Sequence, residues 1–131
     1  MKYNVVILQG MSSKRTLILG ATNNPARYAY LAAHRLTAAG HEIVNIGIKN
    51  GEVSGVTIQS AGEALPGIHT VTLYIGPQRQ PAYYDYIVNT RPKRIIFNPG
   101  TENPELEALA QQQGIEVVRA CTLVMLSTGQ Y

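Results

Sequence analysis

The stretch TLILGATNNPARY, Thr16 to Tyr28, decides the fold of this chain. It starts as an apolar run of Leu and Ile, turns at Gly20, and continues through Asn24 and Pro25 into a helical pattern. A strand that passes through a short turn into a helix directs free backbone N–H groups and the positive end of the helix dipole toward one point. The stretch therefore predicts a strand, a helix and, between them, a site for a phosphate-bearing ligand.

The turn differs from the dinucleotide-binding fingerprint G-x-G-x-x-G, because Gly20 is the only glycine of that pattern present here. Dinucleotide sites also place an acidic residue after the second strand, where this chain has Asn45-Ile46-Gly47-Ile48-Lys49. A lysine at that place suits an adenosine that carries an extra phosphate, as coenzyme A or a 2′-phosphorylated dinucleotide does. The alternative is that Lys49 is an ordinary solvated loop residue.

Strand-like and helix-like segments alternate along the rest of the chain. Asn24 and Asn103 each precede a proline, which predicts two helices with an asparagine N-cap and proline at the first helical position. The alternation predicts an α/β, three-layer Rossmann-like fold, with an about five-stranded parallel sheet and helices on both faces. We expect helices over residues 25–39, 81–89 and 104–113, and strands over residues 15–20, 42–47, 70–75, 94–97 and 115–120.

Two segments are less regular than the rest. In the connection from Ile48 to Ile68 we expect a short extended piece around Val56 and a single helical turn over Ser60 to Leu65. Cys121 to Leu126 forms either a terminal helical turn or a continuation of the core.

Length and composition indicate one domain. We expect it over residues 15–131, preceded by an N-terminal extension over residues 1–14, with Met1 and Met11 both left open as the native start.

A net charge of +3 with 15% charged residues is too mild to indicate nucleic-acid binding. No stretch reaches the roughly 18 consecutive apolar residues of a membrane span. The single cysteine, Cys121, fits a reducing compartment, so we expect a cytoplasmic protein.

The carboxyl edge of the predicted sheet brings four loops together. In such sheets ligands bind beyond the carboxyl ends of the strands, where the strand order reverses. The loops that meet there span residues 20–28, 47–49, 75–79 and 98–101. Three of them hold Gly or Pro beside polar groups, which lets the backbone approach a ligand closely. This convergence predicts one binding site without naming its ligand.

These residues resemble the small CoA-binding domain family of bacteria and archaea. Its members are single-domain Rossmann-like proteins similar to the CoA-binding N-terminal domain of the succinyl-CoA synthetase α subunit. The resemblance covers about Thr16 to Thr122, through LILGATNNPARYAYLAAHRLTAAGHEIVNIGIK, VTLYIGPQ and IIFNPGTENPELEALAQQQGIEVVRACT. The connection NGEVSGVTIQ departs from the family's pattern of a lysine, an aromatic residue and a short helix.

The resemblance implies a division of labour among the loops. The first loop would surround the nucleotide phosphates, the basic residue after the second strand would meet the ribose phosphate, and the later loops would line the path of adenine and pantetheine. It thereby places coenzyme A or acyl-CoA against Gly20, Ala21, Thr22, Asn24, Pro25, Arg27, Tyr28, Lys49, Gly76, Pro77, Asn98, Pro99 and Gly100.

Two functions remain open. The first is a CoA or acyl-CoA binding protein without enzymatic activity, whose further partner is a protein or a second copy of the chain. The second is an NADPH-dependent reductase or a CoA-transforming enzyme, with Tyr28 as proton donor and Arg27 as clamp. We favour binding, because no Tyr-x-x-x-Lys pair, Ser-His-Asp arrangement or paired carboxylates occur near the candidate loops. We therefore expect no catalytic residue and no metal site, and neither nucleic acid nor a membrane as partner.

Overall fold

The computed structural model describes residues 13–131. Of the N-terminal extension expected over residues 1–14, only Ser13 and Lys14 belong to this part. The expectation about the extension and about the native start therefore lies outside the described residues and stays a prediction.

In the described part of the chain, seven strands form one sheet in the order β3-β4-β2-β1-β5-β6-β7. Neighbouring strands are parallel, except that β3 is antiparallel to β4. The α/β Rossmann-like fold is thus confirmed, and the strands beyond the five expected ones form the hairpin β3–β4, which contains the short extended piece expected around Val56. The strands are β1 (Thr16–Leu19), β2 (Ile43–Ile46), β3 (Glu52–Val53), β4 (Val56–Gln59), β5 (Thr70–Leu73), β6 (Arg94–Phe97) and β7 (Glu116–Arg119).

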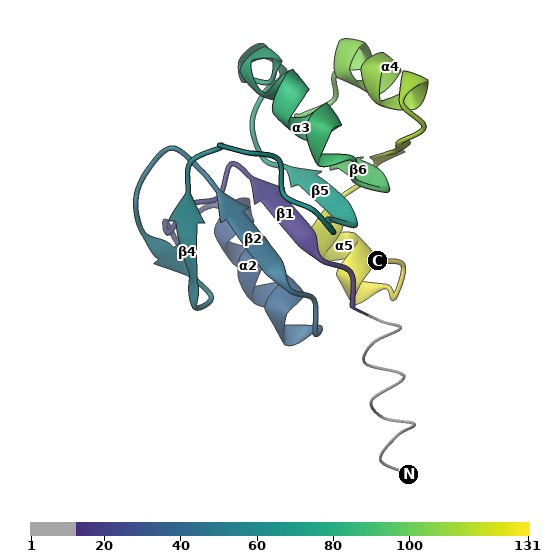
Figure 1. Cartoon of the computed structure of the whole chain (residues 1–131). Coiled ribbons are helices and arrows are strands. Elements are labelled where there is room, and N and C mark those ends of the chain that lie inside the picture. The colour runs from purple at the N-terminus through teal and green to yellow at the C-terminus, as the bar shows by residue number, and fades with distance from the viewer. Residues whose placement is uncertain (1–12) are drawn as a thin grey trace.

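Helices cover both faces of the sheet (Figure 1). On one face α2 (Tyr28–Ala38) packs beside α5 (Thr122–Ser127), and on the other face α3 (Tyr84–Thr90) packs beside α4 (Pro104–Gln112). Two 3-10 turns, η1 (Pro77–Arg79) and η2 (Pro81–Tyr83), lead into α3. None of the helices seen in residues 13–131 is long and apolar enough to cross a membrane.

The central strand β1 is buried on both sides. Leu17 and Leu19 pack with Phe97 in the core beneath α3 and α4, whereas Ile18 packs with Leu36 of α2 on the opposite face. Successive side chains of a strand point to opposite faces, so a strand covered on both sides needs the continuous apolar run that the sequence shows here.

The first helix begins at Tyr28, three residues later than expected, so the predicted Asn24 cap and Pro25 start are wrong. Asn24 closes a turn instead. Its Oδ1 accepts a hydrogen bond from Ala26 N at 3.0 Å, and its carbonyl oxygen accepts one from Arg27 N at 3.1 Å. Arg27 then has extended backbone angles, φ −102° and ψ 147°, and is itself the N-cap. The Asn24 side chain and carbonyl group thus close a separate turn over residues 24–27, and the helical bonds begin only after the extended backbone of Arg27.

The remaining helical predictions have different outcomes. The helix capped by Asn103 is confirmed, as is a helix in the segment from Cys121 onward. The helix expected over residues 81–89 starts as a 3-10 turn and becomes α-helical only at Tyr84. The helical turn expected over Ser60 to Leu65 is wrong, since this segment crosses the sheet without helix. Its last residue precedes Pro66, and a residue before proline disfavours helical backbone angles.

Candidate functional site

A cleft of about 880 Å³ lies beyond the carboxyl ends of β1, β2, β5 and β6. From β1 the chain crosses to β2 on one side, and it later returns to β5 on the other side of β1. The loops after β1 and β5 therefore lead away from each other, which leaves space between them. All four loops that the sequence places at this edge contribute to the cleft.

Ten of the thirteen residues expected to bind the ligand line this cleft. They are Gly20, Ala21, Thr22, Asn24, Arg27, Tyr28, Lys49, Gly76, Pro99 and Gly100.

The other three, Pro25, Pro77 and Asn98, are not among the lining residues. Asn98 is buried, and its Nδ2 donates to Thr72 Oγ1 at 2.7 Å and to Leu73 O at 2.8 Å. Its Oδ1 accepts a hydrogen bond from Thr122 N at 2.9 Å. Its amide thus joins β5, β6 and α5 beneath the cleft.

Gly20 gives the first loop its close approach to the neighbouring strand. Its φ of +101° lies in the region that favours glycine, and a Cβ there would lie 2.9 Å from both Ile75 Cγ2 and Tyr74 O. The N–H groups of Gly20 and Ala21 both donate to Ile46 O at 2.9 Å. The start of the loop is therefore held to β2, and these two N–H groups face protein rather than the cleft.

The N–H groups at the start of α2 are available to a ligand. Within residues 13–131 no atom accepts a hydrogen bond from Tyr28 N or Ala29 N, and both residues line the cleft. Free N–H groups at a helix start carry the positive end of the helix dipole. The free N–H groups that the sequence placed at Asn24 thus lie one turn further along, at Tyr28 and Ala29.

Three cations line the cleft, and each comes from a different loop. Arg27 follows β1, Lys49 follows β2 and Arg79 follows β5. No Asp or Glu of the described residues lines the cleft. The two ion pairs within residues 13–131, Arg15–Glu42 and Arg119–Glu107, lie elsewhere and do not involve these three cations. The cleft therefore presents positive charge to an incoming ligand.

Two large apolar side chains flank the cleft in exposed positions. Tyr28 is 75% exposed and Ile48 is 76% exposed, far more than is usual for side chains of their size and character. They come from the loops after β1 and β2, which also supply Arg27 and Lys49. An apolar pair beside cations suits a ligand that joins a flat base to phosphate groups.

Tyr74 follows β5 and lines the inner part of the cleft. Burial raises its pKa to about 12, so the hydroxyl stays protonated at neutral pH. The hydroxyl lies out of contact with water beside the hydroxyls of Thr72 and Thr122, which hydrogen-bond to each other at 2.8 Å. Tyr74 is therefore a half-buried wall of the cleft, and its pKa lies far from neutrality.

Sequence reasoning did not single out several lining residues. Arg79 lies in a loop that was expected to contribute, and a cation in a Gly-Pro loop after a strand was the signal that could have identified it. Tyr83 carried no such signal, because it lies outside the four expected loops, in the 3-10 turn Pro81–Tyr83 that precedes α3. No three His, Cys, Asp or Glu side chains come together as metal ligands within the described residues.

Comparisons with known proteins agree with this geometry. A family model described as "CoA binding domain" matches residues 14–127. No curated protein matches the chain.

Several solved structures are similar. A crystal structure described as that of an uncharacterized protein has 56% sequence identity and a TM-score of 0.89, with 91% of this chain and 98% of that chain covered. A structure described as that of cell-free ID.343 from Thermus thermophilus has 18% identity and a TM-score of 0.78, with 100% of this chain and 99% of that chain covered. A hypothetical protein from Pyrococcus horikoshii OT3 has 22% identity and a TM-score of 0.79, with 98% of this chain and 91% of that chain covered. At such low identities the last two show the fold alone.

Proposed function

Because the chain belongs to the CoA-binding domain family, we propose that it binds coenzyme A or an acyl-CoA and catalyses no reaction. The binding unit in this proposal is residues 15–131. The observation that carries it is the cleft at the point of strand reversal, where three cations and no acidic side chain of the described residues face the ligand.

The cleft suits the order of groups along coenzyme A. In our proposal Lys49 binds the ribose phosphate, because the loop after β2 lies at one end of the row of strands β2-β1-β5-β6 whose loops line the cleft. Arg27 and the N–H groups of Tyr28 and Ala29 bind the pyrophosphate, as helix starts commonly do. The exposed faces of Tyr28 and Ile48 pack on the adenine.

The pantetheine arm then runs over β5 and β6. Gly76, Pro99 and Gly100 lie on this side of the cleft and present small side chains or none. Such residues suit an arm that carries amides but no charge, because they let backbone groups come close to it.

We propose binding rather than catalysis from the chemistry of the lining residues. His, Cys, Asp and Glu, the side chains that most often move protons or attack substrates, are absent from the lining in the described residues. Tyr74 holds its proton too tightly to serve as an acid at neutral pH. A protein partner or a second copy of the chain, and a cytoplasmic location, remain predictions.

Calorimetry with coenzyme A, dephospho-CoA and NADPH tests the proposal. We expect coenzyme A to bind more tightly than dephospho-CoA, because only the former carries the ribose phosphate that Lys49 meets. A mass spectrum of freshly purified native protein should also show bound coenzyme A. Tight binding of NADPH with no signal from coenzyme A would instead support a reductase.

Variants of the two proposed phosphate ligands make the test specific. Arg27→Ala and Lys49→Ala should each weaken coenzyme A binding about tenfold at low salt, with losses that shrink as salt rises. Lys49→Ala should also bind coenzyme A and dephospho-CoA equally well. The control is Lys93→Ala, an exposed lysine next to β6 at the amino end of the sheet, which should leave all affinities unchanged. Equal affinity of the unaltered protein for both ligands would refute the role of Lys49.

A further inference from the structure

Gln80 is a fully buried polar side chain directly behind the cleft. It lies between η1 and η2 with 0% of its surface exposed, and it is not itself a lining residue. Its neighbours Arg79 and Ala82 do line the cleft. A buried amide is stable only where its hydrogen bonds are made within the protein, so its partners show what it holds.

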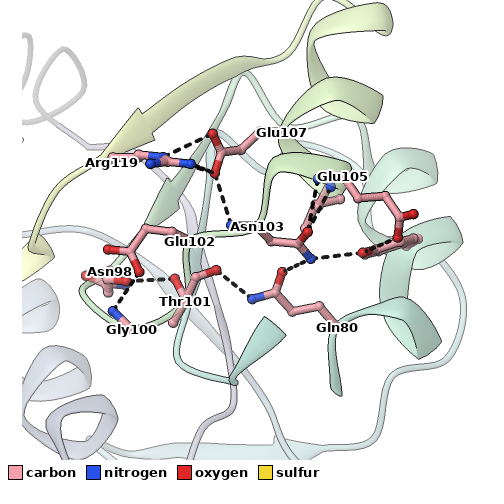
Figure 2. A network of polar contacts seen from close by, with 11 residues as sticks. Gln80, Asn98, Gly100, Thr101, Glu102, Asn103, Glu105, Glu107 and Arg119 are labelled. Carbon is pink, nitrogen blue, oxygen red and sulfur yellow. Dashed lines mark hydrogen bonds and ion pairs between the residues drawn. The ribbon is translucent and has the colours of Figure 1, made fainter. Parts of the chain in front are cut away.

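The side chain of Gln80 joins the loops after β5 and β6 (Figure 2). Its Nε2 donates to Thr101 O at 2.8 Å, and its Oε1 accepts from Asn103 Nδ2 at 2.8 Å. The Nε2 also donates to Ile75 O at 3.1 Å. Both carbonyl groups can only accept hydrogen bonds, so the orientation of the amide is determined by its partners. Ile75 and Thr101 line the cleft on these two loops.

Gln80 makes every hydrogen bond that connects these two loops to each other in residues 13–131. Asn103 extends the connection to α4, because its Oδ1 accepts from Glu105 N and Leu106 N as the N-cap. Its Nδ2 also donates to Tyr84 OH at 2.9 Å, at the start of α3. The spacing of the two loops is thus tied to both helices on that face.

We propose that Gln80 is a positioning residue for the pantetheine half of the cleft, where it sets the separation of the loops after β5 and β6. The inference rests on the proposed function, since it assigns the pantetheine arm to these loops. Without the amide, the carbonyl groups of Ile75 and Thr101 lose their buried partner. They then turn toward water, which moves both walls of the cleft.

The test compares two ligands on one variant, Gln80→Met, which keeps side-chain length but removes the amide. The ligands are coenzyme A and adenosine 3′,5′-bisphosphate, which has both phosphate positions but lacks the pantetheine arm. We expect the affinity for coenzyme A to fall about tenfold while that for the bisphosphate changes less than about twofold. Partial unfolding would lower both affinities by the same factor, so their ratio separates positioning from general stability. Gln112→Met, on the exposed side of α4, should leave both affinities unchanged.

Asn103→Asp is the second variant and carries the test if Gln80→Met does not fold. It keeps the oxygen that caps α4 but replaces the N–H group that donates to Gln80 Oε1 with a second oxygen that can only accept, so we expect a loss for coenzyme A that exceeds the loss for the bisphosphate. Equal losses for both ligands, or no loss for either, in the variants that fold would overturn the inference while the proposed function stands. Failure of the unaltered protein to bind coenzyme A would overturn the proposed function itself.

Discussion

At the scale of single residues, the first two loops of the cleft are held in contact by the absence of a side chain. A Cβ at Gly47 would lie 2.4 Å from Ala21 O and 3.1 Å from Ile58 Cγ2. Backbone atoms on one side and a core side chain on the other leave no room for adjustment. Gly47 therefore brings the loop that carries Lys49 against the loop that carries Arg27.

Gly47→Ala should lower the free energy of unfolding by about 1–3 kcal/mol, because the added methyl group forces the two loops apart. It should also weaken coenzyme A binding, since Arg27 and Lys49 move with their loops. Urea denaturation and calorimetry measure the two effects. The matched control is Gly62→Ala, where the new Cβ meets nothing within 4 Å, so both quantities should stay close to the original values. Equal effects of the two changes would contradict the argument.

At the scale of secondary structure, the two Asn-Pro pairs from which the sequence predicted a helix start, Asn24-Pro25 and Asn103-Pro104, behave differently. Asn103 caps α4, with its side chain accepting from two backbone N–H groups of the first turn. Asn24 closes a turn that precedes α2, and Arg27 takes the cap position there without a side-chain hydrogen bond. Asn103 is also buried and bonded to Gln80, whereas Asn24 is exposed in the cleft.

Alanine substitutions at these two positions should separate a helix cap from a turn. Asn103→Ala should lower the free energy of unfolding by about 2 kcal/mol, because it removes the cap of α4 and leaves the buried Gln80 oxygen without its donor. Asn24→Ala should cost less than about 1 kcal/mol, since only an exposed turn is loosened. Thermal and urea denaturation compare the two directly. A larger loss at Asn24 would show that this residue caps α2 after all.

At the scale of the whole molecule, a cluster of polar side chains lies at the amino ends of the strands, opposite the cleft. Tyr131 hydrogen-bonds to Thr16 of β1, and its ring packs 4.9 Å from His41 and 4.4 Å from the Arg94 guanidinium. His41 Nδ1 accepts a hydrogen bond from Lys14 N at 2.9 Å, which requires a neutral ring with its proton on Nε2. The cluster joins segments from both ends of the described chain.

His41 and His69, which directly precedes β5, both lie at this edge and both have lowered pKa values. Burial lowers the pKa of His41 most, and Lys14 and Arg94 lower it further. Burial also lowers the pKa of His69, with contributions from Arg94, Lys14 and Lys93 that Glu116 partly offsets. The folded protein therefore takes up protons on these rings at a lower pH than the unfolded chain does.

Stability should consequently fall on mild acidification. Unfolded histidines bind protons below about pH 6.5, while the folded state resists protonation until its lower pKa is reached. The stabilising contribution is thus complete above about pH 6.5 and is lost as the pH falls through the folded-state pKa. Urea denaturation between about pH 7.5 and 5.5 measures the fall in the free energy of unfolding. His41→Gln and His69→Gln should each reduce this dependence, whereas His34→Gln, on the exposed side of α2, should not. A free energy of unfolding that is constant or rises over this range would contradict the prediction.

Local patterns in the sequence predicted most of the fold. Continuous apolar runs such as Leu17 to Leu19 indicate doubly covered strands, and the alternation of strands with capped helices indicates a parallel sheet. The short extended piece expected around Val56 is present, but its pairing as the hairpin β3–β4 at the edge of the sheet was not predicted, because the strands are short and carry little pattern of their own. Asn45 of β2 donates to the carbonyl groups of Val53 and Val56 and so holds the hairpin turn.

By itself, the sequence determined the strand-helix order, the four loops at one edge and the family resemblance, because each depends on residues close together in the chain. The tertiary structure alone decided that Asn98 serves the core and that Tyr74 and Tyr83 reach the cleft. These outcomes depend on contacts between residues far apart in sequence, such as Gln80 with Thr101, whose energies no local pattern encodes.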